Sequence, residues 1–380
     1  MYRPRRLADF VSFLVGNPAV LRQVAAYAAG TVRVSDVVVP SVFTPYRQQL
    51  TTELSNILRS GIMQRNAALD ALLAGPGLTY NMPNWKDLDN DDENISNDDP
   101  ADTSEPNKIG TMTEVGVRMS RNSSWASMDL TAQLIAADPM DAIARRVAAY
   151  WDRRRQRAIV AIAMGVLAMN DAAPAGGSTH TAGDMTLDIS GGAYSAGVTD
   201  FSAEAVIQAE GLMGDAVGAL GSIMVHSVIY NRMRVNNLID FIPDATNPAA
   251  AAVPTFLGRR VVVDDGMPNP AGAGAADLGA GIYDTWIFAP GFFQYGEGSP
   301  ETPTEVVRKA DIGNGAGGDV LHDRVEWLIH PVGHAYIGTP PVGGPSNAST
   351  TNNLAAATSW RRVYPERKQI GFVRLRTRES

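Results

Sequence analysis

The stretch DPMDAIARRVAAYWDRRRQRAIVAIAMGVLAMN, residues 138–170, decides the fold of this 380-residue chain. Asp138 is a favourable N-cap, and Pro139 suits the first position of a helix. Apolar residues then recur at three- and four-residue steps, and nothing breaks the pattern before Asn170. The pattern predicts one helix over 139–169, about 45 Å long from the helical rise. Because this length exceeds that of an ordinary globular helix, we expect a spine on which other elements are arranged.

Two strand-like segments precede this helix and flank an acidic insertion. The segments LTYNMPNW at 78–85 and NKIGTMTEVGVRMS at 107–120 predict a pair of strands. Between them, residues 85–105 contain nine acidic residues and one lysine. We expect an extended β-hairpin with a solvated acidic tip, because a charge run of this kind does not form a core. Earlier in the chain, apolar spacing predicts helices at about 45–60 and 67–74.

The chain after the long helix mixes helices and strands. Apolar spacing predicts helices at 202–220 and 227–238. Strands are expected in MTLDIS, SIMVH, RRVVVDDGMP, YDTWIFAPGFFQYG and DVLHDRVEWLIHPVGHAYIG. Residues 339–358 have the composition of a low-complexity loop, and residues 1–35 that of a short helical arm.

Composition excludes several classes of protein. The chain is 45% hydrophobic and 19% charged, which is typical of a folded protein, and its length favours more than one domain. It has no cysteine, which excludes disulfides, thiolate catalysis and cysteine-based metal sites. No apolar run is long enough to span a membrane. Asp9, Arg22 and Gln23 interrupt a signal-like amino terminus, so we expect no cleaved signal.

The formal charge of −8 argues against a uniformly basic nucleic-acid binder, but it is an average over unlike segments. The tract 85–105 alone carries −8. Residues 1–33 have five arginines against one aspartate, and residues 361–380 have seven basic residues against two acidic ones. These two basic ends are candidates for contact with another protein chain or with nucleic acid.

Three patterns resemble enzyme sites, and each lacks the context that its chemistry needs. The glycine-rich GNGAGG at 313–318 is followed by a strand-like segment instead of the helix that a dinucleotide site requires. Ser195 in AYSAG has no helix directly after it, as a nucleophile elbow would. His330 and His334 are separated by a proline and a glycine, and no carboxylate completes a zinc-type pattern. We expect no catalytic residue, no cofactor and no metal site.

The order of arm, acidic hairpin, long helix and mixed remainder resembles the major capsid proteins of tailed double-stranded DNA bacteriophages, which share the Hong Kong 97 capsid fold. The most specific segments are SDVVVPSVFTPYRQQLTTELSNILRSGI, NMPNWKDLDNDDENIS and the run from SRNSSWASMDL through the long helix. Further support comes from HSVIYNRMRVNNLIDFIP, FLGRRVVVDDGMP, APGFFQYGEG and WLIHPVGHAYIG, so that the resemblance covers most of residues 35–340.

This resemblance implies an α+β fold with a fixed order of parts. They are an N-terminal arm and helix (1–77), an extended β-hairpin or E-loop (78–120), a peripheral domain (121–199) with the spine helix at 139–169, a mainly axial, mixed α/β domain (200–320), and a return to the peripheral domain that ends in the basic segment (321–380).

The resemblance also implies a structural protein without enzymatic activity. Such proteins are made in the host cytoplasm and self-assemble into hexamers and pentamers of an icosahedral shell, the capsid of the virion. The partners it implies are further copies of the chain, a separate scaffolding protein, a portal, a decoration protein and the packaged double-stranded DNA, held by non-specific contact. No membrane partner is expected.

Two alternatives remain at the level of sequence. One is an exported α/β binding protein or hydrolase, suggested by the signal-like start and AYSAG, and the other is an encapsulin-like compartment shell. On the capsid interpretation, exposed tryptophans would pack on adjacent subunits, and the acidic tip would pair with arginines of the long helix on a neighbour. The candidate contact residues are Trp85, Asp91, Asp92, Glu93, Trp125, Arg153, Arg154 and Arg155.

Overall fold

The chain divides into two compact units in the computed structural model. Unit 1 comprises residues 1–52, 121–151 and 299–325, and unit 2 comprises residues 53–120, 152–298 and 326–380. The residues that the structure describes are 31–32, 57, 60–88, 92–96, 98–99, 101, 103, 107–131, 139–174, 178, 180–242, 253–268 and 281–379. The helical arm expected at 1–35 and the helix expected at 45–60 lie almost entirely outside them.

Unit 1 is formed mainly by strands. Strand β5 (Met119–Met128) pairs in parallel with β1 (Thr31–Val32), and β13 (Thr304–Lys309) pairs antiparallel with the first half of β14 (Gly318–Pro331). β13 and β14 are joined by a turn that contains the glycine-rich sequence 313–318.

The glycines of this turn allow it to approach the end of β5 closely. A Cβ on Gly318 would lie 2.7 Å from the carbonyl oxygen of Ser127, and one on Gly313 would lie 2.3 Å from Cε of Met128. Gly313 also has a φ of +67°, which favours glycine. The sequence 313–318 is therefore a structural turn, as its context predicts, and the segment after it is a strand.

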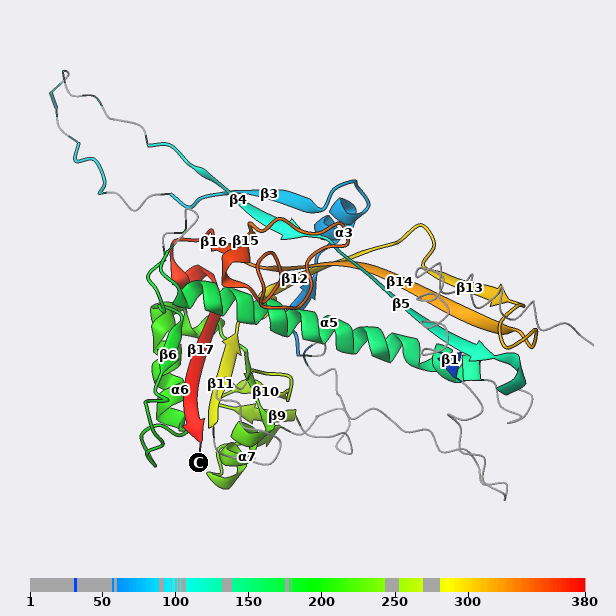
Figure 1. Cartoon of the computed structure of the whole chain (residues 1–380). Helices are drawn as coiled ribbons and strands as arrows, with labels where there is room; N and C mark the ends of the chain where they lie inside the picture. Colours follow the sequence, from blue (N-terminus) through cyan, green and yellow to red (C-terminus); the bar gives the residue numbers. More distant parts are fainter. Residues whose placement is uncertain are drawn as a thin grey trace, which may run out of the picture. The chain divides into compact units, whose positions relative to one another are not determined.

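The long helix is α5 (Pro139–Asp171), which confirms the helix predicted at 139–169 (Figure 1). Residues up to Trp151 belong to unit 1 and the following ones to unit 2. Within unit 2, nearly every side chain from Ala158 to Asn170 is buried or half-buried. A helix that is apolar on all sides must be surrounded by other elements, so this part of α5 is a core element of unit 2.

The described residues of unit 2 include a seven-stranded sheet in the order β6-β17-β11-β7-β10-β9-β8. The strands are β6 (Thr186–Asp188), β7 (Ser222–Val225), β8 (Asp240–Ile242), β9 (Val253–Phe256), β10 (Arg259–Val263), β11 (Gly281–Phe288) and β17 (Phe372–Glu379). β17 pairs antiparallel with β11 along its whole length and parallel with β6. The last strand of the sequence therefore lies inside the sheet.

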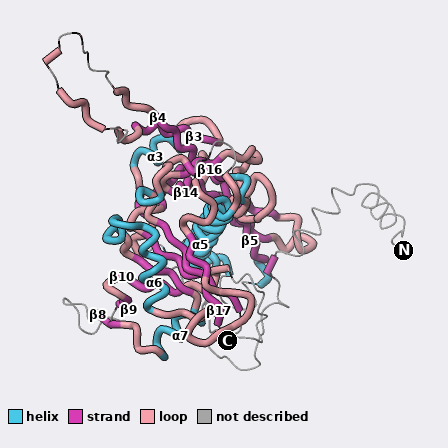
Figure 2. The backbone as a smooth tube through the Cα atoms, turned by 90° about the vertical axis from the view of Figure 1, so that its left-hand side faces the viewer, coloured by secondary structure: helices cyan, strands magenta, loops and turns pink. Residues whose placement is uncertain are grey.

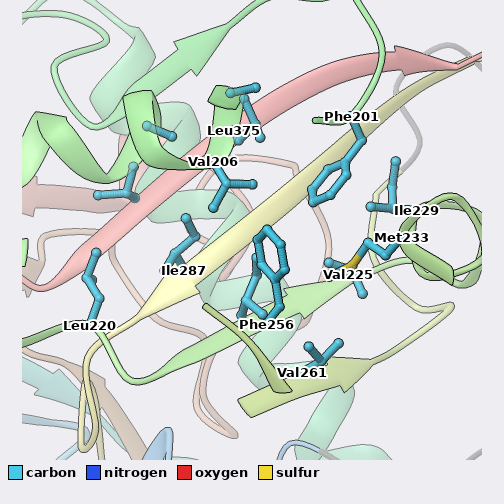
Figure 3. Packing of buried hydrophobic residues seen from close by; sticks show 14 of the residues in the cluster. Phe201, Val206, Leu220, Val225, Ile229, Met233, Phe256, Val261, Ile287 and Leu375 are labelled. Carbon is cyan, nitrogen blue, oxygen red and sulfur yellow. The ribbon is translucent and has the colours of Figure 1, made fainter. Parts of the chain in front are cut away.

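Helices cover one face of this sheet: α6 (Ala203–Glu210), the 3-10 helix η3 (Gly211–Ala219) and α7 (Ser227–Val235) (Figure 2). Side chains from the helices and strands meet in one apolar cluster, in which Val206, Phe256 and Ile287 lie together (Figure 3). The single helix expected over 202–220 is wrong in its second half. Gly214 has a φ of 56°, outside the α-helical region, so the helix cannot continue regularly through it.

The acidic hairpin belongs to a second sheet of unit 2, with the order β16-β15-β4-β3 (Figure 1). The strands are β3 (Thr79–Trp85), β4 (Thr111–Val117), β15 (His334–Tyr336) and β16 (Trp360–Arg362). β3 and β4 pair antiparallel from Thr79 opposite Val117 to Trp85 opposite Thr111. Both predicted hairpin strands and their pairing are confirmed.

The predicted helix at 67–74 is present as α3 (Ala67–Leu73), with the side chain of Asn66 as its N-cap. Its buried Leu69 and Leu73 pack with Tyr80 of β3 and Leu328 of β14. α3 follows β2 (Met63–Arg65), which pairs in parallel with β12 (Phe293–Gly298), and β12 pairs antiparallel with the second half of β14. These elements form a support for the inner end of the hairpin.

The low-complexity segment 339–358 is a loop, as expected, but much of it is firmly packed. Leu354 is fully buried, and its carbonyl oxygen accepts a 2.7 Å hydrogen bond from Nε1 of Trp360. Gly165 of α5 lies directly against both groups. The segment thus packs on the long helix within unit 2. None of the described helices is both long and apolar enough to cross a membrane.

Candidate assembly interface

The outer part of the β3–β4 hairpin exposes apolar and acidic side chains together. Trp85, at the end of β3, is 69% exposed, and Leu88 and Ile95 beyond it are also exposed. Asp92 and Glu93 are exposed as well, whereas Asp91 lies outside the described residues. Several large apolar side chains exposed along one segment favour a surface that a partner covers.

The two faces of the hairpin differ because side chains alternate along a strand. Tyr80 and Met82 of β3 pack toward α3, and Asn84 donates a 3.0 Å hydrogen bond to Glu114 of β4. Trp85 belongs to the opposite face, where it is paired with the exposed Thr111. The inner face is thus occupied by the chain itself, and the face with Trp85 remains open to solvent.

The three candidate arginines of α5 differ in their surroundings. Arg154 is exposed and Arg153 is half-exposed. Arg155 is mostly buried, with its guanidinium 4.7 Å from the ring centre of Tyr295 and 3.6 Å from the carboxylate of Glu297. A cation held against an aromatic ring and beside a carboxylate stabilises its own fold. Arg155 is therefore the weaker candidate for contact with another copy.

Trp125 of β5 has partners within unit 1. Its ring meets that of Tyr150 edge to face at 5.3 Å, and Tyr150 packs on Trp151 at 5.1 Å. Nε1 of Trp151 donates a 2.5 Å hydrogen bond to the carboxylate of Asp323 on β14. This aromatic row joins β5 to α5, a role that the sequence spacing does not indicate, and a contact of Trp125 with another subunit remains a prediction.

The basic carboxyl-terminal segment uses much of its charge within the chain. Nη1 of Arg362 lies 2.8 Å from the carboxylate of Asp184, and the side chain of Arg362 is almost fully buried. Arg374 pairs with Asp171 at 2.6 Å and Arg376 with Asp284 at 2.7 Å, and Lys368 forms an exposed pair with Asp215 at 2.8 Å. These internal pairs argue against residues 361–380 as a nucleic-acid-binding surface.

The enzyme-like patterns do not converge on a site. Ser195 lies in an exposed loop before α6. Nε2 of His330 is 2.5 Å from the carboxylate of the buried Glu114, whereas Nδ1 of His334 lies 2.9 Å from the carbonyl oxygen of Val332. The two histidines thus have separate partners, and no group of three His, Asp or Glu side chains in the described parts of the chain is placed to hold a metal ion.

Comparison with curated sequences finds one strong relative. The chain is 36% identical over 353 residues to a protein described as "Major capsid protein" of Bacillus phage SPP1, and the match covers 91% of this chain and 98% of the relative. No protein-family model matches the chain.

Solved structures with the same fold come from phage capsids. The capsid of Ralstonia phage GP4 matches with a TM-score of 0.54 at 8% identity, covering 90% of this chain and 96% of that one. The capsid of cyanophage P-SCSP1u matches at 0.53 and 11% identity, over 90% and 93% of the two chains. The cyanophage Pam1 capsid matches at 0.52 and 12%, over 90% and 98%. At these identities the likeness concerns the fold, and it agrees with the α+β architecture described above.

Proposed function

Because this chain belongs to the major capsid proteins of tailed bacteriophages, we propose that its acidic hairpin tip and the arginines of its long helix join neighbouring copies in the shell. The protein is a structural component of the virion and not an enzyme, and its copies assemble with one another into a capsid shell. The two alternatives, an exported hydrolase or binding protein and a compartment shell, have no support among the relatives.

The observation that carries this proposal is the separation of opposite charges on exposed parts of one chain. The tract 85–105 holds a net charge of −8, equal to that of the whole chain. Exposed and half-exposed arginines lie on α5, among them Arg153 and Arg154. Single exposed ion pairs contribute about 0.2–1 kcal/mol, so several pairs repeated around a shell are needed for a useful contribution.

Trp85 supplies the apolar part of the same contact. Charge complementarity mainly sets the orientation and specificity of an interface, whereas buried aromatic side chains contribute most of its free energy. An indole exposed beside an acidic tract fits this division of roles. In this proposal, Trp85 packs on the adjacent subunit while Asp91, Asp92 and Glu93 face its arginines, and Trp125 is a further contact.

The proposal includes the organisation expected for the family. Residues 78–120 act as the E-loop, 121–199 form the peripheral domain with its spine helix, and 200–320 form most of the axial domain, between the arm and the carboxyl-terminal return. Copies are arranged as hexamers and pentamers around double-stranded DNA. A scaffolding protein, a portal and a decoration protein are the other proposed partners.

Contact with DNA is proposed for the amino-terminal rather than the carboxyl-terminal basic segment. Residues 1–33 have five arginines against one aspartate. Much of the charge in residues 361–380 is paired with carboxylates of the same chain. Non-specific attraction to phosphates depends on cations that replace counterions, so the internally paired charges of residues 361–380 make that segment the weaker candidate.

The double change Arg153→Glu and Arg154→Glu is expected to reduce the yield of closed shells by about tenfold or more, because both charges would then repel the acidic tip. Arg155 is kept, since its contacts with Tyr295 and Glu297 stabilise the chain itself. Sedimentation of expressed protein, followed by negative-stain microscopy, measures shell yield.

Two further variants make this test specific. Changing Asp92 and Glu93 to lysine in the double variant restores opposite charges, and shells should reappear. Arg145→Glu with Arg146→Glu alters net charge equally on the same helix and should leave more shells than the first double variant. Normal shells from that first variant, or no rescue by the lysine changes, would contradict the proposed pairing.

A further inference from the structure

Glu114 is a buried carboxylate at the root of the β3–β4 hairpin. Only 4% of the residue is exposed, although the outer end of its strand, at Thr111, is exposed to solvent. Its inner-face position would ordinarily hold an apolar side chain, because Met82 and Tyr80 on the same face pack toward α3. A charge in such a place is costly unless several hydrogen bonds satisfy it.

The structure provides those hydrogen bonds from four separate places. Nε2 of His330, at the end of β14, lies 2.5 Å from Oε2 of Glu114. Asn84 of β3 donates to Oε1 at 3.0 Å. The hydroxyl of Tyr364, beyond β16, and the backbone amide of Gly333, between β14 and β15, also hydrogen-bond to the carboxylate. Glu114 thus links both hairpin strands to three segments distant in sequence.

We propose that Glu114 is an acid-sensitive joint: its carboxylate holds the root of the hairpin against β14 and the segments around Gly333 and Tyr364, and its protonation releases the hairpin while the seven-stranded sheet stays folded. A protonated carboxyl group accepts fewer hydrogen bonds and becomes a donor itself. It also loses the charge-assisted contact with His330, so the hydrogen bonds that meet at Glu114 are weakened together.

The direction of the pH effect follows from the environment of Glu114. Burial alone would raise the pKa of this carboxyl, but the hydrogen bond and charge of His330, with the bonds from Tyr364 and Gly333, bring the pKa below its ordinary 4.5. A lowered pKa in the folded state means that the ionised group contributes stability above about pH 4.5. That stability is lost as the pH falls through the lowered value.

Besides His330 and Tyr364, which contact Glu114 directly, His334 is a further titratable group near the joint, and its effect must be separated from that of Glu114. It is fully buried on β15, and burial lowers its pKa from 6.5 to about 3, with the nearby charges of Arg362 and His330 acting in the same direction. Neutral His334 stabilises the fold above pH 6.5, and this contribution falls between pH 6.5 and about 3. The two windows overlap, so a variant of each residue is needed.

The test is hydrogen exchange of the purified full-length chain, followed peptide by peptide at a series of pH values. In the unsubstituted protein, amides of β3 and β4 should lose protection below about pH 4.5, after correction for intrinsic exchange, while those of β7, β11 and β17 keep theirs. In Glu114→Gln, hairpin amides should exchange about tenfold faster already at neutral pH, because an amide group cannot replace the carboxylate. Protection of the seven-stranded sheet in the same sample shows that this variant is folded.

His334→Phe removes the buried titratable group on β15 and serves as the matched control. In this variant the hairpin should still lose protection in the same acid range as in the unsubstituted protein. The proposal is overturned if His334→Phe abolishes the acid release, or if hairpin and sheet lose protection together in the unsubstituted protein. It is also overturned if a folded Glu114→Gln protein keeps normal hairpin protection at neutral pH.

Discussion

Replacing Gly165 with alanine is expected to lower the free energy of unfolding by about 3 kcal/mol, the upper end of the range for overpacked sites. The added Cβ would lie 2.1 Å from the carbonyl oxygen of Leu354 and 2.6 Å from Nε1 of Trp360. Those two groups are hydrogen-bonded to each other at 2.7 Å and buried, so neither is free to move aside. Alanine gains about 1 kcal/mol of helix propensity, which only partly offsets the clash. Urea unfolding of the unassembled chain measures the difference.

Gly211→Ala is the matched control for this substitution. Gly211 follows α6 with a φ of −58°, and no heavy atom of the described residues lies within 4 Å of a Cβ built on it. The change should therefore alter stability by less than about 0.5 kcal/mol. If Gly165→Ala were equally harmless, the tight packing of residues 354–360 on α5 would be disproved.

Arg362→Met is expected to destabilise unit 2 by about 3 kcal/mol, because it removes one partner of a buried ion pair. Nη1 of Arg362 lies 2.9 and 2.8 Å from the two carboxylate oxygens of Asp184. Its Nε and Nη2 donate to the carbonyl oxygens of Tyr364 and Pro365 at 2.8 and 3.1 Å. Methionine fills similar space but leaves the carboxylate and both carbonyls without these donors. The unfolding free energy of the purified variant provides the measurement.

A double-mutant cycle identifies the cause of that loss. If an uncompensated charge dominates, Arg362→Met combined with Asp184→Leu should be more stable than Arg362→Met alone. Losses that simply add would indicate instead that the pair itself contributes little and that packing or the two carbonyls account for the effect.

Much of the fold can be predicted from local sequence because its main elements carry strong local signals. The long helix has an uninterrupted apolar pattern, and α5 extends only two residues past the expected 139–169. The hairpin strands alternate clearly, and their polar linker separates them. In both cases the pattern depends on neighbours within one element, so a single sequence is sufficient.

Elements that depend on distant partners are not evident from the sequence. The sequence MSRNSSWASM of β5 is largely polar, and its strand conformation follows from pairing with β1 and from lying beside β14. Tertiary pairing of this kind overrides weak local preference. The kink at Gly214, inside the helix expected over 202–220, depends on one glycine conformation that spacing alone does not reveal.

The candidate contact residues also divide into those that local sequence predicts correctly and those whose surroundings depend on distant segments. The exposure of Trp85 agrees with its place at the edge of an acidic tract, whereas Arg155 and Trp125 have intrachain partners from remote segments. Glu114 is not found by looking for titratable residues that lie close together in the sequence, because its partners His330 and Tyr364 lie more than 200 residues away. The one available signal is an acidic residue on the inward side of an alternating strand, where an apolar residue is expected.

The position of β17 links folding to the order of biosynthesis. This strand lies between β6 and β11, yet it is synthesised after all of its sheet partners. Until the ribosome has passed Glu379, the edge of β11 has no neighbour on that side and β6 has nothing to pair with in this sheet. A nascent or truncated chain that lacks β17 therefore cannot complete the sheet in which β17 joins β6 to β11.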